Sequence, residues 1–337
     1  MRLSYSLNKN IFEATVGSLV NKLHLSKRRD TLFFEDIFIN YIKECEDAGH
    51  GEEMKRIGQK WMAVSFKTLM PSALERLPPV IILNMFMKNV WINLGLMKNF
   101  HANKTGDIIE IRTENEAITK VIGNNYFSVG LFIGILNIIF GSQVDVIEVS
   151  QREIFSKYVF KIKHGNPYKI NSKSKKTYDK LNYLAPIKGF TLRDSFKRNI
   201  FQLKEGNKIY FRDKSLYTVE NTIFHLLGNS EILLERIPYI SYDYFKEIIR
   251  KSSSKEKFVL LKTLLQIMGW GIITVVYRED YIVVDIKNPP FGLQKEKDNW
   301  NFLIQTILGY LWVIDKKFNL GDVVETYKNI KITYSKN

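Results

Sequence analysis

The chain has 337 residues, enough for two domains of ordinary size, and 45% of them are hydrophobic, which is typical of a folded protein and excludes a disordered one. Its single cysteine, Cys45, excludes an internal disulfide and any cysteine-rich zinc or iron–sulfur site, so a reducing, cytoplasmic location is expected. The net charge of +15 is uneven, because residues 165–214 hold 13 basic and only 4 acidic side chains.

The first part of the chain is predicted to be mainly helical. Apolar residues recur there with a helical period and are interrupted by charged or glycine-containing segments. The predicted helices are Ile11–Leu25, Leu32–Glu46, a helix that follows Gly51, and Val80–Leu94. Cys45 falls on the apolar side of the second helix, which favours a small core residue over a reactive thiol.

The stretch Asn124–Ser150 is predicted to be an apolar helix that leads into a β-strand. Gly130 and Gly134 lie four residues apart, on one face of this helix, where another backbone or a ligand could approach closely. A weaker copy of the same pattern, Asp298–Tyr327, keeps one of these glycines as Gly309. The apolar run Tyr126–Phe140 is only about 15 residues long, too short for a typical membrane span, so a transmembrane protein is not expected.

The likeness of the two stretches extends to the residues before them. Landmarks recur at offsets of 174, 173 and 175 residues. The pairs are Gly95 with Gly269, Asn115 with Asn288, and Gly134 with Gly309. A nearly constant spacing favours a duplicated domain, and the alternative is two unrelated α+β halves.

The polar, basic segment after Lys163 marks a linker, so the predicted organisation is a first domain at 1–164, a linker at 165–180 and a second domain at 181–337. In the second domain Leu216–Leu227 is predicted to be helical, and Ser253 with Glu256 forms a capping box that starts another helix. A β-hairpin is expected at Ile272–Ile286, around the turn Arg278-Glu279-Asp280.

The order of these motifs resembles a known superfamily. The first half is similar to subunits of the transport protein particle (TRAPP), and the second to the related 4-vinyl-reductase-type small-molecule-binding domain. The matching segments are Asn8–Phe12, Gly17–Val20, Gly51–Gly58 and Asn124–Ser150 in the first half, and Met268–Gly271, Asn288–Phe291 and the helix with Gly309 in the second.

The resemblance implies an α+β fold of two tandem domains, each with helices packed on a small antiparallel sheet and an apolar pocket between the layers. Members of this superfamily bind hydrophobic ligands or acyl chains, or act as assembly and tethering subunits, and are generally not enzymes. A homodimer or another protein partner is therefore a further expectation.

Two departures from the family pattern limit what can be carried over. The segment Leu69–Pro79 lacks the cysteine that is acylated in some TRAPP subunits, so a covalently attached acyl chain is not expected. The tail Asp322–Asn337 lacks the cysteines that suggest metal binding in vinyl-reductase-type domains, so no metal is expected. A free hydrophobic ligand is what remains.

An apolar pocket is thus the leading candidate site. Small residues would make room for an apolar ligand and aromatic residues would cover it. The expected lining is Gly130, Phe132, Gly134, Ile135 and Ile138 from the first half, and Trp270, Trp300, Ile307, Gly309 and Leu311 from the second. The alternative is a fully packed core that uses the same residues.

No pattern in the sequence indicates catalysis. The five histidines are scattered, and no nucleophile elbow, phosphate-binding loop or metal-binding helix motif occurs. Neither a catalytic residue nor a cofactor is predicted, and an enzyme remains a hypothesis without a supporting constellation.

The basic segment 165–214 supports a hypothesis of a different class, in which the protein binds nucleic acid or an anionic lipid surface. The side chains that would carry this binding are Lys173, Lys175, Lys176, Lys197, Arg198 and Arg212. The alternative is a solvated linker followed by a β-hairpin whose aromatic residues face a core.

Overall fold

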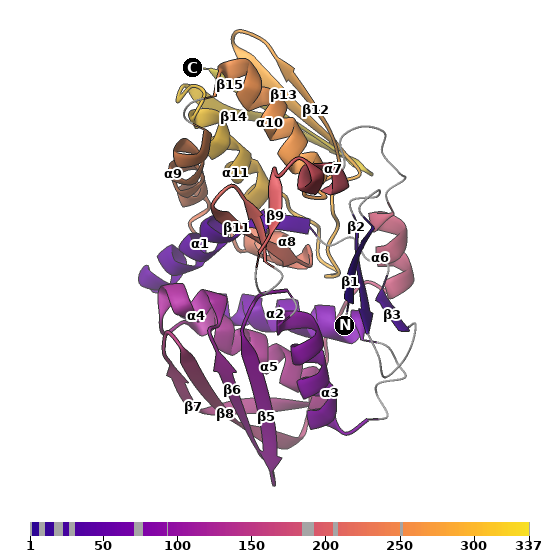
Figure 1. The fold of residues 1–337 in the computed structure, drawn as a ribbon. Helices are drawn as coiled ribbons and strands as arrows, with labels where there is room; N and C mark the ends of the chain where they lie inside the picture. The colour runs from indigo at the N-terminus through magenta and orange to yellow at the C-terminus, as the bar shows by residue number, and fades with distance from the viewer. Residues whose placement is uncertain are drawn as a thin grey trace.

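Two lobes stand end to end, each with a four-stranded antiparallel sheet on the outside and helices toward the centre (Figure 1). The predicted α+β class, with helices packed on small antiparallel sheets, is confirmed. The computed structural model describes residues 2–6, 11–16, 23–26, 31–70, 77–92, 94–183, 192–204, 208–249 and 252–336. No helix in these ranges is both long and apolar enough to span a membrane.

The first half builds its sheet in the strand order β5-β6-β8-β7 beneath a layer of helices. Apolar residues alternate along the strands, as in a sheet with one buried face: Ile109 and Ile111 of β6 are fully buried and pair with Phe160 and Tyr158. Its elements are α2 (Gly51–Leu69), α3 (Pro79–Phe86), the π-helix η2 (Met87–Ile92), β5 (Asn99–Thr105), β6 (Ile108–Glu114), α4 (Ala117–Ile122), α5 (Tyr126–Phe140), β7 (Ser142–Gln151) and β8 (Phe155–Pro167).

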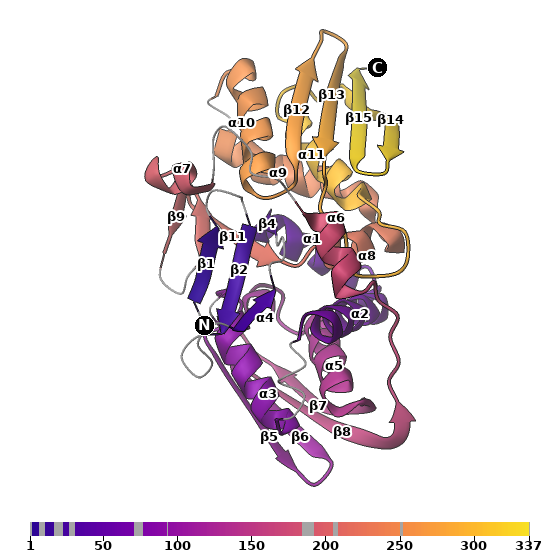
Figure 2. The same cartoon turned by 90° about the vertical axis from the view of Figure 1, so that its right-hand side faces the viewer.

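The second half repeats this arrangement with the equivalent strand order β12-β13-β15-β14 (Figure 2). The predicted hairpin and the capping box of Ser253 and Glu256 are both present. Its elements are α9 (Ile237–Ile249), α10 (Ser254–Ile267), β12 (Ile272–Tyr277), β13 (Tyr281–Lys287), α11 (Asn301–Trp312), β14 (Phe318–Thr326) and β15 (Asn329–Lys336).

The paired landmarks occupy matching places in the two halves. Asn115 follows β6 with a φ of 49°, and Asn288 follows β13 with a φ of 50°, both in the left-handed region that asparagine tolerates. The glycines that precede the first strand of each sheet, Gly95 and Gly269, also have positive φ. These shared backbone features, with the shared strand order, favour the duplicated-domain interpretation.

A central sheet joins the two halves. Strand β4 (Thr31–Phe34) pairs with β11 (Lys214–Val219), and β10 (Ile209–Phe211) and β9 (Phe201–Leu203) continue the sheet. Helix α1 (Glu35–Asp47) follows β4 and packs on α9, while α8 (Thr222–Ser230) follows β11 and packs on α2. A strand and a helix of each half therefore pack against the other half. The boundary predicted at residue 164 separates the halves along the chain, but their side chains share one packed region.

The predicted linker is ordered. Residues 165–180 include the end of β8 and most of α6 (Lys175–Asn182), whose N-cap Ser174 accepts a hydrogen bond from the backbone N–H of Thr177. Tyr178 of α6 is fully buried, and the backbone N–H of Lys173 donates to the Leu293 carbonyl at 2.7 Å. These contacts hold the segment against the second half.

Three predicted helices were wrong at their N-terminal ends, where the structure has a strand. Ile11–Val16 forms β2, between β1 (Arg2–Ser6) and β3 (Leu23–Ser26), so the opening helix implied by the TRAPP resemblance is not formed there. Its alternating Phe12, Ala14 and Val16 also fit a strand period.

The predicted helices Leu32–Glu46 and Leu216–Leu227 each begin with a strand, β4 or β11, and become helical only at Glu35 and Thr222. All four residues of β4 are buried, and a strand covered on both faces loses the alternation that would identify it.

Candidate functional site

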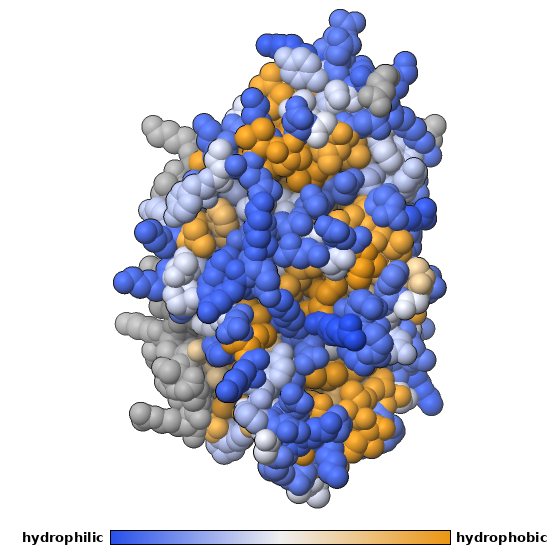
Figure 3. Space-filling model, turned by 180° about the vertical axis from the view of Figure 1, so that it is seen from behind, coloured by the Kyte–Doolittle hydropathy of each residue, from blue (hydrophilic) through white to orange (hydrophobic). Residues whose placement is uncertain are grey.

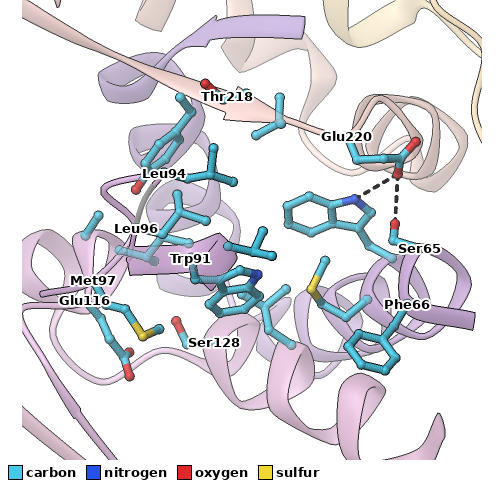
Figure 4. A pocket seen from close by; sticks show the side chains of 18 of the residues that line it. Ser65, Phe66, Trp91, Leu94, Leu96, Met97, Glu116, Ser128, Thr218 and Glu220 are labelled. Carbon is cyan, nitrogen blue, oxygen red and sulfur yellow. Dashed lines mark hydrogen bonds between the residues drawn. The ribbon is translucent and has the colours of Figure 1, made fainter. Parts of the chain in front are cut away.

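A cavity of about 90 Å³ lies in the first half, between α2, η2, α5 and the neighbouring strand β11 (Figure 4). Most of the side chains around it are apolar, and among the described residues no lysine, arginine or histidine lines it. The apolar lining includes Phe38, Trp61, Met62, Phe66, Met70, Phe86, Val90, Trp91, Leu94, Leu96, Met97, Leu131 and Phe132, and the polar lining is Ser65, Glu116, Ser128, Thr218 and Glu220.

The π-helix η2 supplies one wall of the cavity. Asn84, one turn earlier, donates to the Ala102 carbonyl at 2.8 Å and accepts from the Ala102 N–H at 3.0 Å, which fastens α3 to β5. The wider π-turn then places Val90 and Trp91 at the cavity. Single π-turns are frequent at functional sites, because they redirect side chains away from the regular helical positions.

Glu220 lies at one side of the cavity and is 4% exposed. One carboxylate oxygen accepts from the Trp61 indole N–H at 3.2 Å and the Ser65 hydroxyl at 2.9 Å. The other accepts from the Tyr178 hydroxyl at 3.1 Å and from both the backbone N–H and the hydroxyl of Thr222. These donors fill the acceptor positions of the carboxylate, so Glu220 joins α2, α6 and α8 and has no position left for a ligand.

Glu116 is the second buried acid at the cavity, immediately before α4. Its carboxyl group accepts hydrogen bonds from the hydroxyls of Thr113, Thr119 and Tyr158, the last two at 2.7 and 2.8 Å. Burial raises the pKa of Glu116, because desolvation disfavours the charged form more than the three donors stabilise it.

Glu116→Gln is expected to remove part of the pH dependence of stability. Because the pKa of Glu116 is raised, the folded protein binds the Glu116 proton more tightly than the unfolded chain does. The stability that the protonated group contributes is fully present below the ordinary pKa of 4.5 and is lost as the pH rises through the raised value. Urea unfolding of both proteins at a series of pH values from about 4.5 upward measures the difference. Glu46, whose pKa burial also raises, is present in both, so parallel pH curves would contradict the assignment to Glu116.

The structure places one of the five first-half pocket residues, Phe132, at the cavity. Gly130 and Gly134 face α2 instead: a Cβ atom would lie 2.0 Å from the Lys55 carbonyl oxygen at Gly130 and 2.3 Å from the Gln59 carbonyl oxygen at Gly134. Ile135 is fully buried in the core, and Ile138 packs against it. The glycines thus permit a close helix crossing rather than a ligand contact.

The five second-half pocket residues belong to a packed core, and none lines the cavity described above. The indole N–H of Trp270 donates to the Leu32 carbonyl at 3.0 Å, and its ring packs on Phe33 and Phe224 with centroid distances of 5.8 and 5.1 Å. Trp300 packs edge-on against His225. Ile307, Gly309 and Leu311 are buried along α11, with Gly309 directly against the Pro238 carbonyl of α9.

The six basic residues of the alternative hypothesis lie in separate places. Lys173 and Lys175 line a surface groove of about 450 Å³ with Lys67 and Lys295. Lys197 and Arg198 lie at the end of α7 (Leu192–Lys197), well apart from α6 (Figure 2). Lys176 is exposed on α6, and the Arg212 guanidinium donates to the Ile248 carbonyl.

The described residues contain no group of three or more histidine, cysteine, aspartate or glutamate side chains placed to hold a metal ion. Burial raises the pKa of the Cys45 thiol to about 12, so the thiolate required for a nucleophile is disfavoured. The two carboxyl groups at the cavity are held by other protein groups, since Ser65 donates to Glu220 and Thr119 donates to Glu116.

No protein-family model, curated protein or solved structure matches this chain. The cavity therefore has to be interpreted from its own chemistry.

Proposed function

We propose that this protein is a non-enzymatic binding protein that holds a hydrophobic small molecule, or one end of an acyl chain, in the cavity of its first half. The observation that carries the proposal is a cavity lined mainly by apolar side chains in the first half. Empty apolar space is unfavourable in a folded protein, because the atoms around it lose packing contacts. A ligand would restore them.

The size of the cavity limits the ligand. An engineered apolar cavity of about 150 Å³ binds benzene, so a cavity of about 90 Å³ encloses only part of a six-carbon ligand. Met70, Phe86 and Leu94 at its border are half-buried, so a longer chain can extend between them toward solvent. Methionine side chains adapt readily to ligands of different shape, and Met62, Met70 and Met97 all line the cavity.

The test is native mass spectrometry of the protein purified from its own source, followed by denaturing extraction. Ala117→Leu adds three carbon atoms inside the cavity, and Ala48→Leu adds the same atoms at an exposed position. We expect a stoichiometric apolar molecule in the original protein and in Ala48→Leu, and its loss from Ala117→Leu. An empty protein that also fails to bind added n-hexane would overturn the proposal.

A scaffold role, in which the protein joins a second copy or another protein, is part of the same proposal. Edge strand β7 carries exposed Val146, Ile147 and Val149, and Phe155 is exposed at the start of β8. Orange apolar patches also interrupt the hydrophilic surface on the rear face (Figure 3). The same native spectra test this role, because a bound protein would appear as an added mass. We further propose a cytoplasmic location, which the buried, reduced Cys45 supports.

A second candidate function is binding of a polyanion, either nucleic acid or an anionic lipid surface, at the groove of Lys67, Lys173, Lys175 and Lys295. Among the described residues no acidic side chain lines this groove, although Lys173 is already paired with Asp298 at 2.6 Å and Lys175 with Asp179. Phosphate contacts release counterions, so binding would weaken steeply with salt. Lys67→Ala and Lys295→Ala should then flatten the salt dependence, whereas unchanged binding would exclude the groove.

A further inference from the structure

Ser128 places a polar group with no partner inside the cavity. The residue is 3% exposed and lies in the first turn of α5, where its backbone N–H donates to Asn125 at 2.8 Å. Its hydroxyl, in contrast, forms no hydrogen bond within the described part of the chain, and Figure 4 shows it directed into the cavity. A hydroxyl that lines a cavity without a protein partner favours a ligand with a hydrogen-bonding group at this position.

Glu116 lies on the same side of the cavity as Ser128, with Met97 beside it (Figure 4). The three hydroxyl donors around Glu116 leave one position of its carboxyl group open, which is an acceptor when the group is ionised and an O–H donor when it is protonated. Ser128 and Glu116 together form a polar end. Beyond Trp91, Figure 4 shows Phe66 on the side where the polar groups of Ser65 and Glu220 are already bonded to each other.

The charge of the lining restricts the ligand further. Within the part of the chain that the structure describes, Glu116 and Glu220 are the carboxyl groups of the lining, and no basic side chain lines the cavity. An anionic head group would be buried beside carboxyl groups without a counter-ion, which is strongly unfavourable. An ammonium group would require a charged Glu116, whereas burial favours the neutral form of this acid.

We propose that the ligand is a neutral amphiphile with a hydroxyl head group, which bonds Ser128 and Glu116 while its short apolar body lies along Trp91 toward Phe66. This assignment rests on the proposed binding function and names the chemical class of the ligand. The ligand hydroxyl bonds the open position of the Glu116 carboxyl group and accepts from the Ser128 hydroxyl. Both polar groups at this end of the cavity are then paired.

The test compares four six-carbon probes with the full-length protein: n-hexane, 1-hexanol, hexanoate and hexylammonium. Binding is followed by NMR of the methionine methyl groups, since Met62 and Met97 line the cavity. Of the three probes with a head group, 1-hexanol is expected to bind about tenfold or more tightly than either charged one, the equivalent of one or two hydrogen bonds.

Ser128→Ala separates the head-group contact from the cavity itself. It should weaken 1-hexanol binding about tenfold and leave n-hexane binding unchanged. Because the lost hydroxyl is unpaired in the empty protein, the variant should be no less stable to urea. Ser241→Ala, which removes a buried hydroxyl in the second half, away from the cavity, is the matched control and should leave both affinities unchanged.

The outcomes distinguish the two proposals. Failure of both n-hexane and 1-hexanol to bind would overturn the binding function as well as the ligand class. If n-hexane binds but Ser128→Ala does not weaken 1-hexanol selectively, or if hexanoate or hexylammonium binds more tightly than 1-hexanol, only the hydroxyl assignment is overturned.

Discussion

Gly130→Ala is expected to lower the free energy of unfolding by about 3 kcal/mol, even though alanine is the better helix former by about 1 kcal/mol. The added Cβ would lie 2.0 Å from the Lys55 carbonyl oxygen and 3.0 Å from the Gln59 backbone nitrogen. Both contacts are with the backbone of α2, so neither can be relieved by a side-chain rotation. The helices must separate, and the loss is measured by urea unfolding.

Gly228→Ala on α8 is the matched control, because its nearest contacts are looser, at 2.8 Å from the Asn299 side chain and 3.0 Å from the Asn299 backbone oxygen, and a smaller loss is expected. Gly309→Ala should behave like Gly130→Ala, since its Cβ would lie 2.2 Å from the Pro238 carbonyl oxygen of α9. A Gly130→Ala protein as stable as the original would show that α2 and α5 can move apart freely. The same geometry makes Gly134→Leu a test of helix packing rather than of ligand binding.

Much of the local structure could be predicted from the sequence because its signals are short-range. Helix α5 starts where Asn125 accepts a hydrogen bond from the N–H of Ser128, and it ends at Gly141 with a φ of 63°. The capping box at Ser253 and the turn between β12 and β13 are equally local. The repeat was recognisable because residues with special backbone conformations, such as Asn115 and Asn288, keep their spacing.

The cavity could not be predicted in the same way, because it is formed by segments far apart in the chain. Glu220 reaches Trp61 and Ser65 across more than 150 residues, and only the pairing of β4 with β11 brings them together. An acidic residue after an apolar strand is by itself a common pattern. The small residues Gly130 and Gly134 were compatible with close approach of either a ligand or a second helix, and only the position of α2 distinguishes these two possibilities.

The two halves differ most clearly at one equivalent position. Leu96 follows Gly95 and lines the cavity, while Trp270 follows Gly269 and is fully packed. Strand β4 lies beside Trp270, and strand β11 lies beside the cavity, so each half is completed by the strand of the other. A larger side chain at this single position accounts for much of the difference between a filled half and an open one.

Trp270→Ala is therefore expected to open a second cavity and to destabilise the protein by about 3–5 kcal/mol, the usual range for removing a buried aromatic ring. The loss includes the hydrogen bond to the Leu32 carbonyl and the ring contacts with Phe33 and Phe224. Trp312→Ala, at a half-buried position on α11, is the matched control and should lose less. Urea unfolding gives both values.

The second cavity should also bind an apolar probe. Saturating n-hexane is expected to raise the thermal unfolding midpoint of Trp270→Ala, because a ligand that binds only the folded state stabilises it. Adding Ala117→Leu to this variant fills the first cavity, so stabilisation that persists in the double variant must come from the new one. If n-hexane fails to stabilise the double variant, the second half has collapsed around the missing ring. The cavity of the first half would then depend on more than the smaller side chain of Leu96 at the equivalent position.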